Sequence, residues 1–199
     1  MSSKYIEHLK TITKHKFYVM RACFRSGFII RGLLHDNSKF GPTEFISSAK
    51  HFQGTRSPIK AEKEDRGYSI AWQNHKGRNR HHWQYWIDWH CGKEYVVEMP
   101  VEYIVELICD WIGAGKAYKK EEWAIDELRT WYEKSKDDII LHNKTRKFLE
   151  YTIYFAATSE KQLFRWLNHR YVDMNYDTVQ ALYKLSKDFE APTYHERSF

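Results

Sequence analysis

The chain has 199 residues, with 32 Lys and Arg against 26 Asp and Glu and a formal charge of +6 at pH 7. This length fits one domain that buries its own core without disulfides or a structural metal, so a second full domain is not expected. The three cysteines, Cys23, Cys91 and Cys109, form no Cys-x-x-Cys pair, which argues against a zinc ribbon. No stretch approaches the roughly 20 apolar residues that span a bilayer, so we expect a cytoplasmic protein with no membrane partner.

The first third of the chain is predicted to be helical. Apolar residues recur at helical spacing almost throughout, and period-2 alternation is confined to residues 94–98. A first helix covers residues 6–24, and Gly27 can end it in a left-handed cap. The next segment, residues 28–36, brings His35 and Asp36 to a helix end or to the turn that follows it. The sequence therefore predicts an all-α fold in a single domain over residues 1–199.

Prolines mark further helix starts. Pro42, Pro58 and Pro100 each stand where a first helical turn tolerates proline, so helices should begin near these residues. Gly67 would close the helix that begins at Pro58. Loops are expected at residues 53–58 and 75–79. The rest of the chain predicts four amphipathic helices, at residues 121–135, 143–157, 160–171 and 176–189.

Histidines are frequent, with 11 in the chain, and several precede residue 83: His15, His35, His75, His81 and His82. Neutral imidazole and carboxylate together suit Mn, Fe, Co, Ni and Zn, so a metal site needs no cysteine here. His15 lies on the apolar side of the first helix, and His8 lies seven residues earlier on the same side. A single inward histidine is more often a hydrogen-bonded core residue than a metal ligand, so either one needs further support.

Asp110 is the carboxylate that most needs a partner. It lies within a strongly apolar helical segment, residues 101–118. Burying such a charge is costly unless it is paired with cations or bound to a metal. Gly113, Ala114 and Ala117 follow it and are small, so another helix, or a metal with its ligands, can come close. A glycine inside a helix costs roughly 1 kcal/mol relative to alanine, so its presence needs a packing or functional reason.

The order of these residues, His15, His35-Asp36 and Asp110, resembles the HD superfamily of metal-dependent phosphohydrolases, whose signature is H…HD…D on an all-helical fold. HKFYVMRA and GLLHDNSKFG are similar to its first helix and its HD element. More narrowly, GLLHDNSKFGPTEF, GYSIAWQNHKGRNRHHWQYW and MPVEYIVELICDWIGAGKAY resemble an uncharacterised family of bacterial and phage proteins. The resemblance covers about residues 5–120. It implies an HD-like helical bundle there, with helices at about 121–199 completing or extending it.

The resemblance implies a set of metal ligands. His15, His35, Asp36 and Asp110 would hold a first divalent transition metal ion. Superfamily members with two ions have further histidines between the HD pair and the last aspartate, where this chain has His75, His81 and His82. These three are closer together than in the two-metal branches, so two roles stay open. Either His75 and one of the other two, with His82 as our choice, bind a second ion, or the cluster holds phosphate and donates protons.

The implied chemistry is hydrolysis of a phosphoester. Divalent ions lower the pKa of a bound water and neutralise charge on the phosphoryl oxygens. Asp36 would also orient that water, and His81 would protonate the leaving oxygen. Positive charge for the phosphate would come from four side chains: Lys39, Lys76, Arg78 and Arg80. For the two arginines, solvated surface charge is an equally good interpretation.

The sequence thus favours a phosphohydrolase acting on a small phosphorylated metabolite, most plausibly a nucleotide. An HD-type diiron oxygenase is the alternative enzyme, because the chain contains the four histidines and two aspartates that such a site needs: His15, His35, Asp36, His75, His82 and Asp110. A third interpretation is a non-catalytic HD scaffold that binds nucleic acid or a protein through its positive charge. No helix-turn-helix or zinc-finger pattern supports nucleic-acid binding, so it is not favoured. A homo-oligomer is left open.

Overall fold

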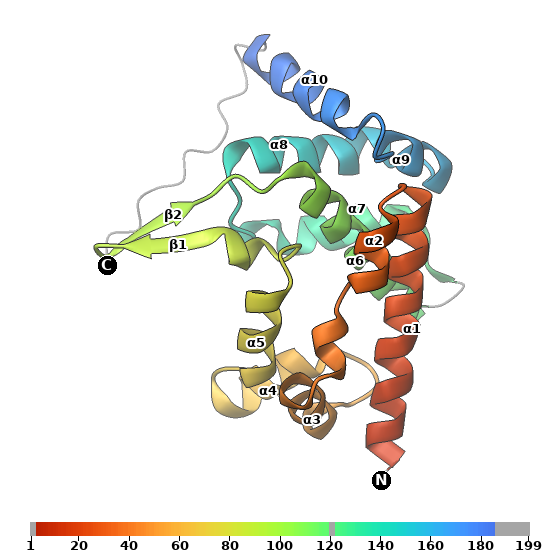
Figure 1. Ribbon diagram of the computed structural model, residues 1–199, viewed down its shortest axis with the longest axis vertical. Helices are drawn as coiled ribbons and strands as arrows, with labels where there is room; N and C mark the ends of the chain where they lie inside the picture. Colours follow the sequence, from red (N-terminus) through yellow and green to blue (C-terminus); the bar gives the residue numbers. More distant parts are fainter. Residues whose placement is uncertain (1–2, 120–121, 186–199) are drawn as a thin grey trace.

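The computed structural model describes residues 3–119 and 122–185, most of which fold into helices (Figure 1). The all-α prediction is confirmed. Within these ranges no helix is long and apolar enough to cross a bilayer. The elements before residue 80 are α1 (Ser3–Arg25), α2 (Ile29–Leu34), the short helix η1 (Asn37–Phe40), α3 (Pro42–His51), α4 (Pro58–Arg66) and α5 (Ile70–Arg78). After them come η2 (Trp83–Trp86), β1 (Ile87–His90), β2 (Lys93–Val96), α6 (Val101–Lys119), α7 (Asp126–Ser135), η4 (Lys136–Asp138), α8 (Asn143–Tyr151), the π-helical turn η5 (Thr152–Ala156), α9 (Glu160–Trp166) and α10 (Val172–Leu185).

Proline and glycine define the helix ends as predicted. Helices α3 and α4 begin at Pro42 and Pro58, and α6 begins directly after Pro100. Gly27 follows α1 with a φ of +80°, and Gly67 follows α4 with a φ of +79°. Both are left-handed conformations that glycine adopts without the steric cost of a Cβ atom.

The loop predicted at residues 75–79 is wrong, because α5 continues to Arg78. The Ser69 side chain caps this helix by accepting a hydrogen bond from the backbone N–H of Trp72. Ala71 and His75 are buried on one face of α5, which packs against α3. Capping and burial outweigh the low helix propensity of the glycine in this segment.

A small hairpin is the only sheet in the described ranges. The segment with period-2 alternation, residues 94–98, overlaps β2, but the hairpin that β2 forms with β1 was not predicted. Cys91 and Gly92 form the turn, with φ of +50° and +75°. Positive φ at both central residues is typical of tight hairpin turns. Both strands are mostly exposed, so neither shows the alternating burial that marks a strand in a sequence.

Helices α1 and α6 pack side by side, and α1 runs along one side of the molecule (Figure 1). A Cβ atom on Gly113 would lie 2.3 Å from Cγ2 of Val19, so glycine is required for this close approach. The predicted packing role of Gly113 is thereby confirmed. Ile104 and Ile108 of α6 are fully buried and belong to the same hydrophobic cluster as Val19 of α1.

The C-terminal helices share this core. Leu128, Leu149 and Val179 belong to the same buried cluster as Val19 and Ile108. Helices α7, α8 and α9 fall within the segments predicted for them, whereas α10 starts at Val172, before the predicted residue 176. Residues 120–121 and 186–199, which include the ends of two predicted helices, lie outside the described residues.

Candidate metal centre

The turn after α2 places two polar side chains at the middle of the molecule. His35 and Asp36 follow the last residue of α2, and both are buried. Asp36 has a φ of +53°, a left-handed conformation that is uncommon for residues other than glycine and is often found at functional sites. The Lys16 Nζ atom holds the turn by donating to the carbonyl oxygens of Leu33 and His35, at 3.0 and 2.6 Å, and to Asn37 Oδ1 at 2.7 Å. Sequence analysis did not identify Lys16.

The four residues predicted for a first metal ion come together from three elements. His15 comes from α1, His35 and Asp36 from the turn, and Asp110 from α6. His15 Nε2 lies 3.0 Å from Asp110 Oδ1 and 3.5 Å from Asp36 Oδ2. His35 Nε2 lies 3.3 Å and 3.2 Å from the same two oxygens. One atom of each residue is within 4.8 Å of those of the others, so the set could hold a metal ion.

A second cluster shares Asp36 with the first. Its members are Asp36, His75, His81 and His82. His75 Nε2 lies 3.4 Å and His81 Nε2 lies 3.5 Å from Asp36 Oδ1, which is the carboxylate oxygen that points away from the first cluster. The two oxygens of Asp36 therefore face different histidine sets, as in a carboxylate that bridges two ions. All three histidines in the 75–82 interval take part, whereas only two were predicted as ligands.

The protein leaves most of the inward-facing atoms of both clusters without hydrogen bonds. The buried side-chain atoms with no hydrogen-bond partner among the described residues include His15 Nε2, His35 Nε2, both Asp36 carboxylate oxygens, His81 Nε2 and His82 Nε2, although Asp36 Oδ2 also forms an ion pair with Lys39. Each unsatisfied buried polar group costs about 1–3 kcal/mol. Because these atoms converge from two sides on one carboxylate, divalent ions would satisfy all of them together.

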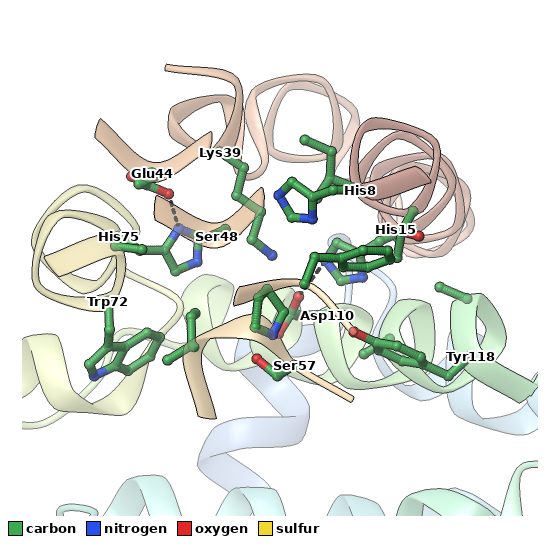
Figure 2. A pocket seen from close by; sticks show the side chains of 18 of the residues that line it. His8, His15, Lys39, Glu44, Ser48, Ser57, Trp72, His75, Asp110 and Tyr118 are labelled. Carbon is green, nitrogen blue, oxygen red and sulfur yellow. Dashed lines mark hydrogen bonds and ion pairs between the residues drawn. The ribbon is translucent and has the colours of Figure 1, made fainter. Parts of the chain in front are cut away.

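Two glutamates hold the outer nitrogens of the histidines. Glu106 Oε1 accepts from Nδ1 of His35 at 3.0 Å and lies 3.2 Å from Nδ1 of His81. Glu44 accepts from Nδ1 of His75 at 2.8 Å (Figure 2). A carboxylate on the outer nitrogen fixes the tautomer that presents Nε2 to a metal. Sequence analysis missed both glutamates, although Glu106 lies one helical turn before Asp110 and so shares its face of α6.

The electrostatics of the centre favour a cation. Burial alone would raise the pKa of Asp36, but His35 and Lys39 outweigh it and hold this pKa well below its ordinary value. Burial also opposes ionisation of Glu106, whose hydrogen bonds with His35 and His81 nevertheless lower its pKa to about 2. Burial would lower the pKa of His35, but three carboxylates, those of Asp36, Asp110 and Glu106, raise it well above its ordinary value. The surplus of negative charge thus attracts a positive ion to this position.

Two histidines of the centre, His81 and His82, are held neutral. Burial, with the neighbouring His35, lowers the pKa of His81. Burial, with His81 and His75 nearby, lowers the pKa of His82 well below its ordinary value. Neutral imidazole is the form that binds a metal ion. Both ring nitrogens of His81 face carboxylates, so this residue could serve as a metal ligand. Its role as proton donor stays a prediction.

A cavity of about 240 Å³ adjoins the two clusters (Figure 2). His15, His75, His82 and Asp110 form its inner wall. Lys39 also points into it, with Nζ 2.5 Å from Asp36 Oδ2. Burial would lower the pKa of Lys39, but the carboxylates of Asp36 and Asp110 raise it, so this lysine stays charged.

The other predicted phosphate-binding cations are elsewhere. Lys76, Arg78 and Arg80 are not among the residues that line the cavity. Arg78 and Arg80 are exposed, and Arg80 donates to the Tyr103 hydroxyl at 3.4 Å. The structure therefore brings only Lys39 of the four cations to the centre. Asn79 is the polar side chain of this segment that reaches inward, and it contacts Ser38 at 2.8 Å.

His8 is buried beside the centre but belongs to neither cluster. Its ring packs against Phe45 and Phe52, with centroid separations of 5.4 and 5.2 Å. Between the two histidines that α1 offered as ligands, the geometry therefore selects His15. His8 instead forms part of the cavity wall next to Lys39 (Figure 2).

Comparison with known proteins gives one match. A family model described as a family of unknown function, DUF5662, matches residues 4–154, which include every residue of both clusters and of the cavity wall. No curated protein and no solved structure matches the chain.

Proposed function

This chain belongs to the DUF5662 family, and we propose that it is a metal-dependent phosphohydrolase of the HD type. It hydrolyses a phosphoester of a small metabolite with metal-activated water. One observation carries the proposal: two buried histidine clusters share the carboxylate of Asp36 and open onto a cavity that holds Lys39. Imidazole and carboxylate without thiolate suit Mn, Fe, Co, Ni or Zn, and the shared carboxylate favours two ions over one.

The first ion would be held by His15, His35, Asp36 and Asp110. The second ion would be held by Asp36, His75, His81 and His82. Bound ions supply a water of lowered pKa and neutralise charge on the phosphoryl oxygens. Side chains of the protein orient the water and bind the phosphate. Asp36 lies between the two clusters and accepts a hydrogen bond from the attacking water, which fixes its direction.

Lys39 would bind the phosphate. Its Nζ lies against Asp36 and carries a full charge, so it donates to a phosphoryl oxygen at the point where negative charge develops. The cavity around it has largely apolar walls, including Ile12, Phe52 and Ile59. These walls exclude bulk water, which strengthens the attraction between Lys39 and the phosphate.

The proposal is tested by metal analysis and an activity panel. Wild type, Asp36→Asn and the control Asp177→Asn, which changes an exposed carboxylate on α10, are loaded with Mn, Co, Ni or Mg. Release of phosphate from monoesters, and of alcohol from diesters, is then measured. Wild type and the control should bind metal and hydrolyse one ester class, whereas Asp36→Asn should bind less metal and hydrolyse no ester. A metal-loaded wild type that hydrolyses no ester would refute the proposal.

A diiron oxygenase is the second candidate, and the bridging position of Asp36 between two clusters is the observation that favours it. Its four-His, two-Asp set consists of His15, His35, Asp36, His75, His82 and Asp110. Loading with iron under anaerobic conditions distinguishes the two activities. A mixed-valent EPR signal with O2 consumption and no release of phosphate would support the oxygenase.

A further inference from the structure

The cavity beside the metal centre is small. Its volume of about 240 Å³ corresponds to roughly eight water molecules at liquid density. Pockets for drug-sized ligands begin at about 300 Å³. Part of the space next to Lys39 must hold the phosphate itself. What remains accepts a short carbon chain, whereas the sugar ring and base of a nucleoside would extend beyond this space.

The wall of the cavity away from the metal centre is mostly apolar. Ile12, Phe52, Ile59 and Ala71 supply it, with Ala114 one helical turn beyond Asp110. Such a surface gains free energy by burying carbon, at about 25 cal/mol per Å². It offers no second cation for a further phosphate, because Lys39 is the one lysine or arginine among the cavity residues that the structure describes.

Among the described residues, four hydroxyl side chains also line the cavity: Thr11, Ser48, Ser57 and Tyr118. His8 is the one histidine of this described lining that belongs to neither metal cluster. Its side chain is only 3% exposed, and its Nδ1 atom has no hydrogen-bond partner among the described residues. The ring is held between Phe45 and Phe52 and lies beside Lys39 at the cavity surface (Figure 2). A neutral imidazole in this position can exchange one hydrogen bond with an uncharged group such as a hydroxyl.

We propose that the substrate is the phosphate monoester of a small alcohol, with a short apolar body and one further hydroxyl group that His8 binds. This inference rests on the proposed function and narrows it, since it replaces a nucleotide with a smaller ester. The phosphate lies at Asp36 and Lys39, the carbon chain lies along the apolar wall, and His8 selects for the hydroxyl.

The test compares three esters on metal-loaded wild type: butyl phosphate, 4-hydroxybutyl phosphate and adenosine 5′-monophosphate. The hydroxylated ester should give the highest kcat/KM, about threefold to tenfold above butyl phosphate, as expected for one hydrogen bond. The nucleotide should give the lowest. A kcat/KM for the nucleotide equal to or above that for both small esters would overturn the inference and leave the proposed hydrolase standing.

Two variants locate the recognition. Ala114→Leu fills the cavity and should lower kcat/KM for both small esters at unchanged metal content, whereas Ala181→Leu adds the same group to an exposed position on α10 and should not. His8→Phe should remove the preference for the hydroxylated ester, measured as the ratio of the two kcat/KM values. A hydroxyl preference that survives in His8→Phe would overturn the role of His8.

Binding separates this inference from the proposed activity. Butylphosphonate cannot be hydrolysed as an ester, so its affinity for metal-loaded protein reports the cavity alone. If no ester is hydrolysed but butylphosphonate binds to wild type and Ala181→Leu and not to Ala114→Leu, the hydrolase fails while the ligand class is supported. If butylphosphonate does not bind to metal-loaded wild type, the inference fails.

Discussion

The replacement of Asp36 by asparagine is the most informative perturbation of the centre. Asparagine has the same shape and tolerates the left-handed conformation of this residue, which has a φ of +53°. It keeps one amide oxygen and loses the second oxygen and the charge. Because Oδ2 faces His15 and His35 while Oδ1 faces His75 and His81, the amide can serve one cluster at most.

The expected effect on stability follows from linkage. At a free metal concentration of 100 times Kd, one bound ion stabilises the folded state by about 2.7 kcal/mol, and two independent ions by about 5.4 kcal/mol. For a chain of this length each kcal/mol shifts Tm by about 2–4 °C. Metal should therefore raise the Tm of wild type by roughly 11–22 °C, and that of Asp36→Asn by no more than about half as much.

The assay is thermal unfolding with and without Mn²⁺, together with metal content after gel filtration. Wild type and Asp177→Asn should retain two ions, and Asp36→Asn at most one. Two ions retained in Asp36→Asn, with the full shift in Tm, would refute the bridging role of Asp36.

Further predictions concern the surroundings of the centre. Glu106→Gln removes the carboxylate shared by two ligand histidines and should weaken metal affinity about 10- to 100-fold in a chelator competition, so an unchanged affinity would contradict its role. Lys39→Met should lower kcat/KM about 10- to 100-fold with metal content retained, and undiminished phosphate release would exclude Lys39 from phosphate binding. Gly113→Ala should lose about 1–3 kcal/mol in urea unfolding, because the new Cβ meets Val19 at 2.3 Å, and combining it with Val19→Ala should restore part of that loss. Burial, with the charge of Lys39, lowers the pKa of His8 from 6.5 to about 4, so the His8 imidazole is protonated at a higher pH in the unfolded chain than in the folded protein. The free energy of unfolding that neutral His8 contributes is therefore present above pH 6.5 and is lost as the pH falls toward 4, and His8→Phe should lose less stability over that window than wild type.

Local sequence signals predicted most of the fold. Helix starts at Pro42 and Pro58 and left-handed ends at Gly27 and Gly67 depend on the backbone chemistry of single residues, so the sequence shows them directly. The segment 75–79 was wrongly predicted to be a loop. Its helix depends on the Ser69 cap, which lies six residues earlier, and on packing against α3, which the sequence does not show.

The site residues that belong to a sequence motif were predictable. The residues that reach the site only through tertiary contacts were not. His15, His35, Asp36 and Asp110 are brought together as the resemblance implied. The contributions of Glu44 and Glu106 depend on which side chain reaches the outer nitrogen of a histidine far away in the chain. The same limit explains why Lys76, Arg78 and Arg80, adjacent to the histidines in sequence, do not line the cavity.

We propose that two metal ions lie on opposite sides of Asp36, and anomalous X-ray diffraction from crystals of the Mn²⁺-loaded protein tests this arrangement. Two anomalous peaks are expected about 3.5–4 Å apart, one beside His15, His35 and Asp110 and the other beside His75, His81 and His82. A Mn²⁺-loaded crystal with no peak at either cluster, or with peaks only at surface carboxylates, would contradict it.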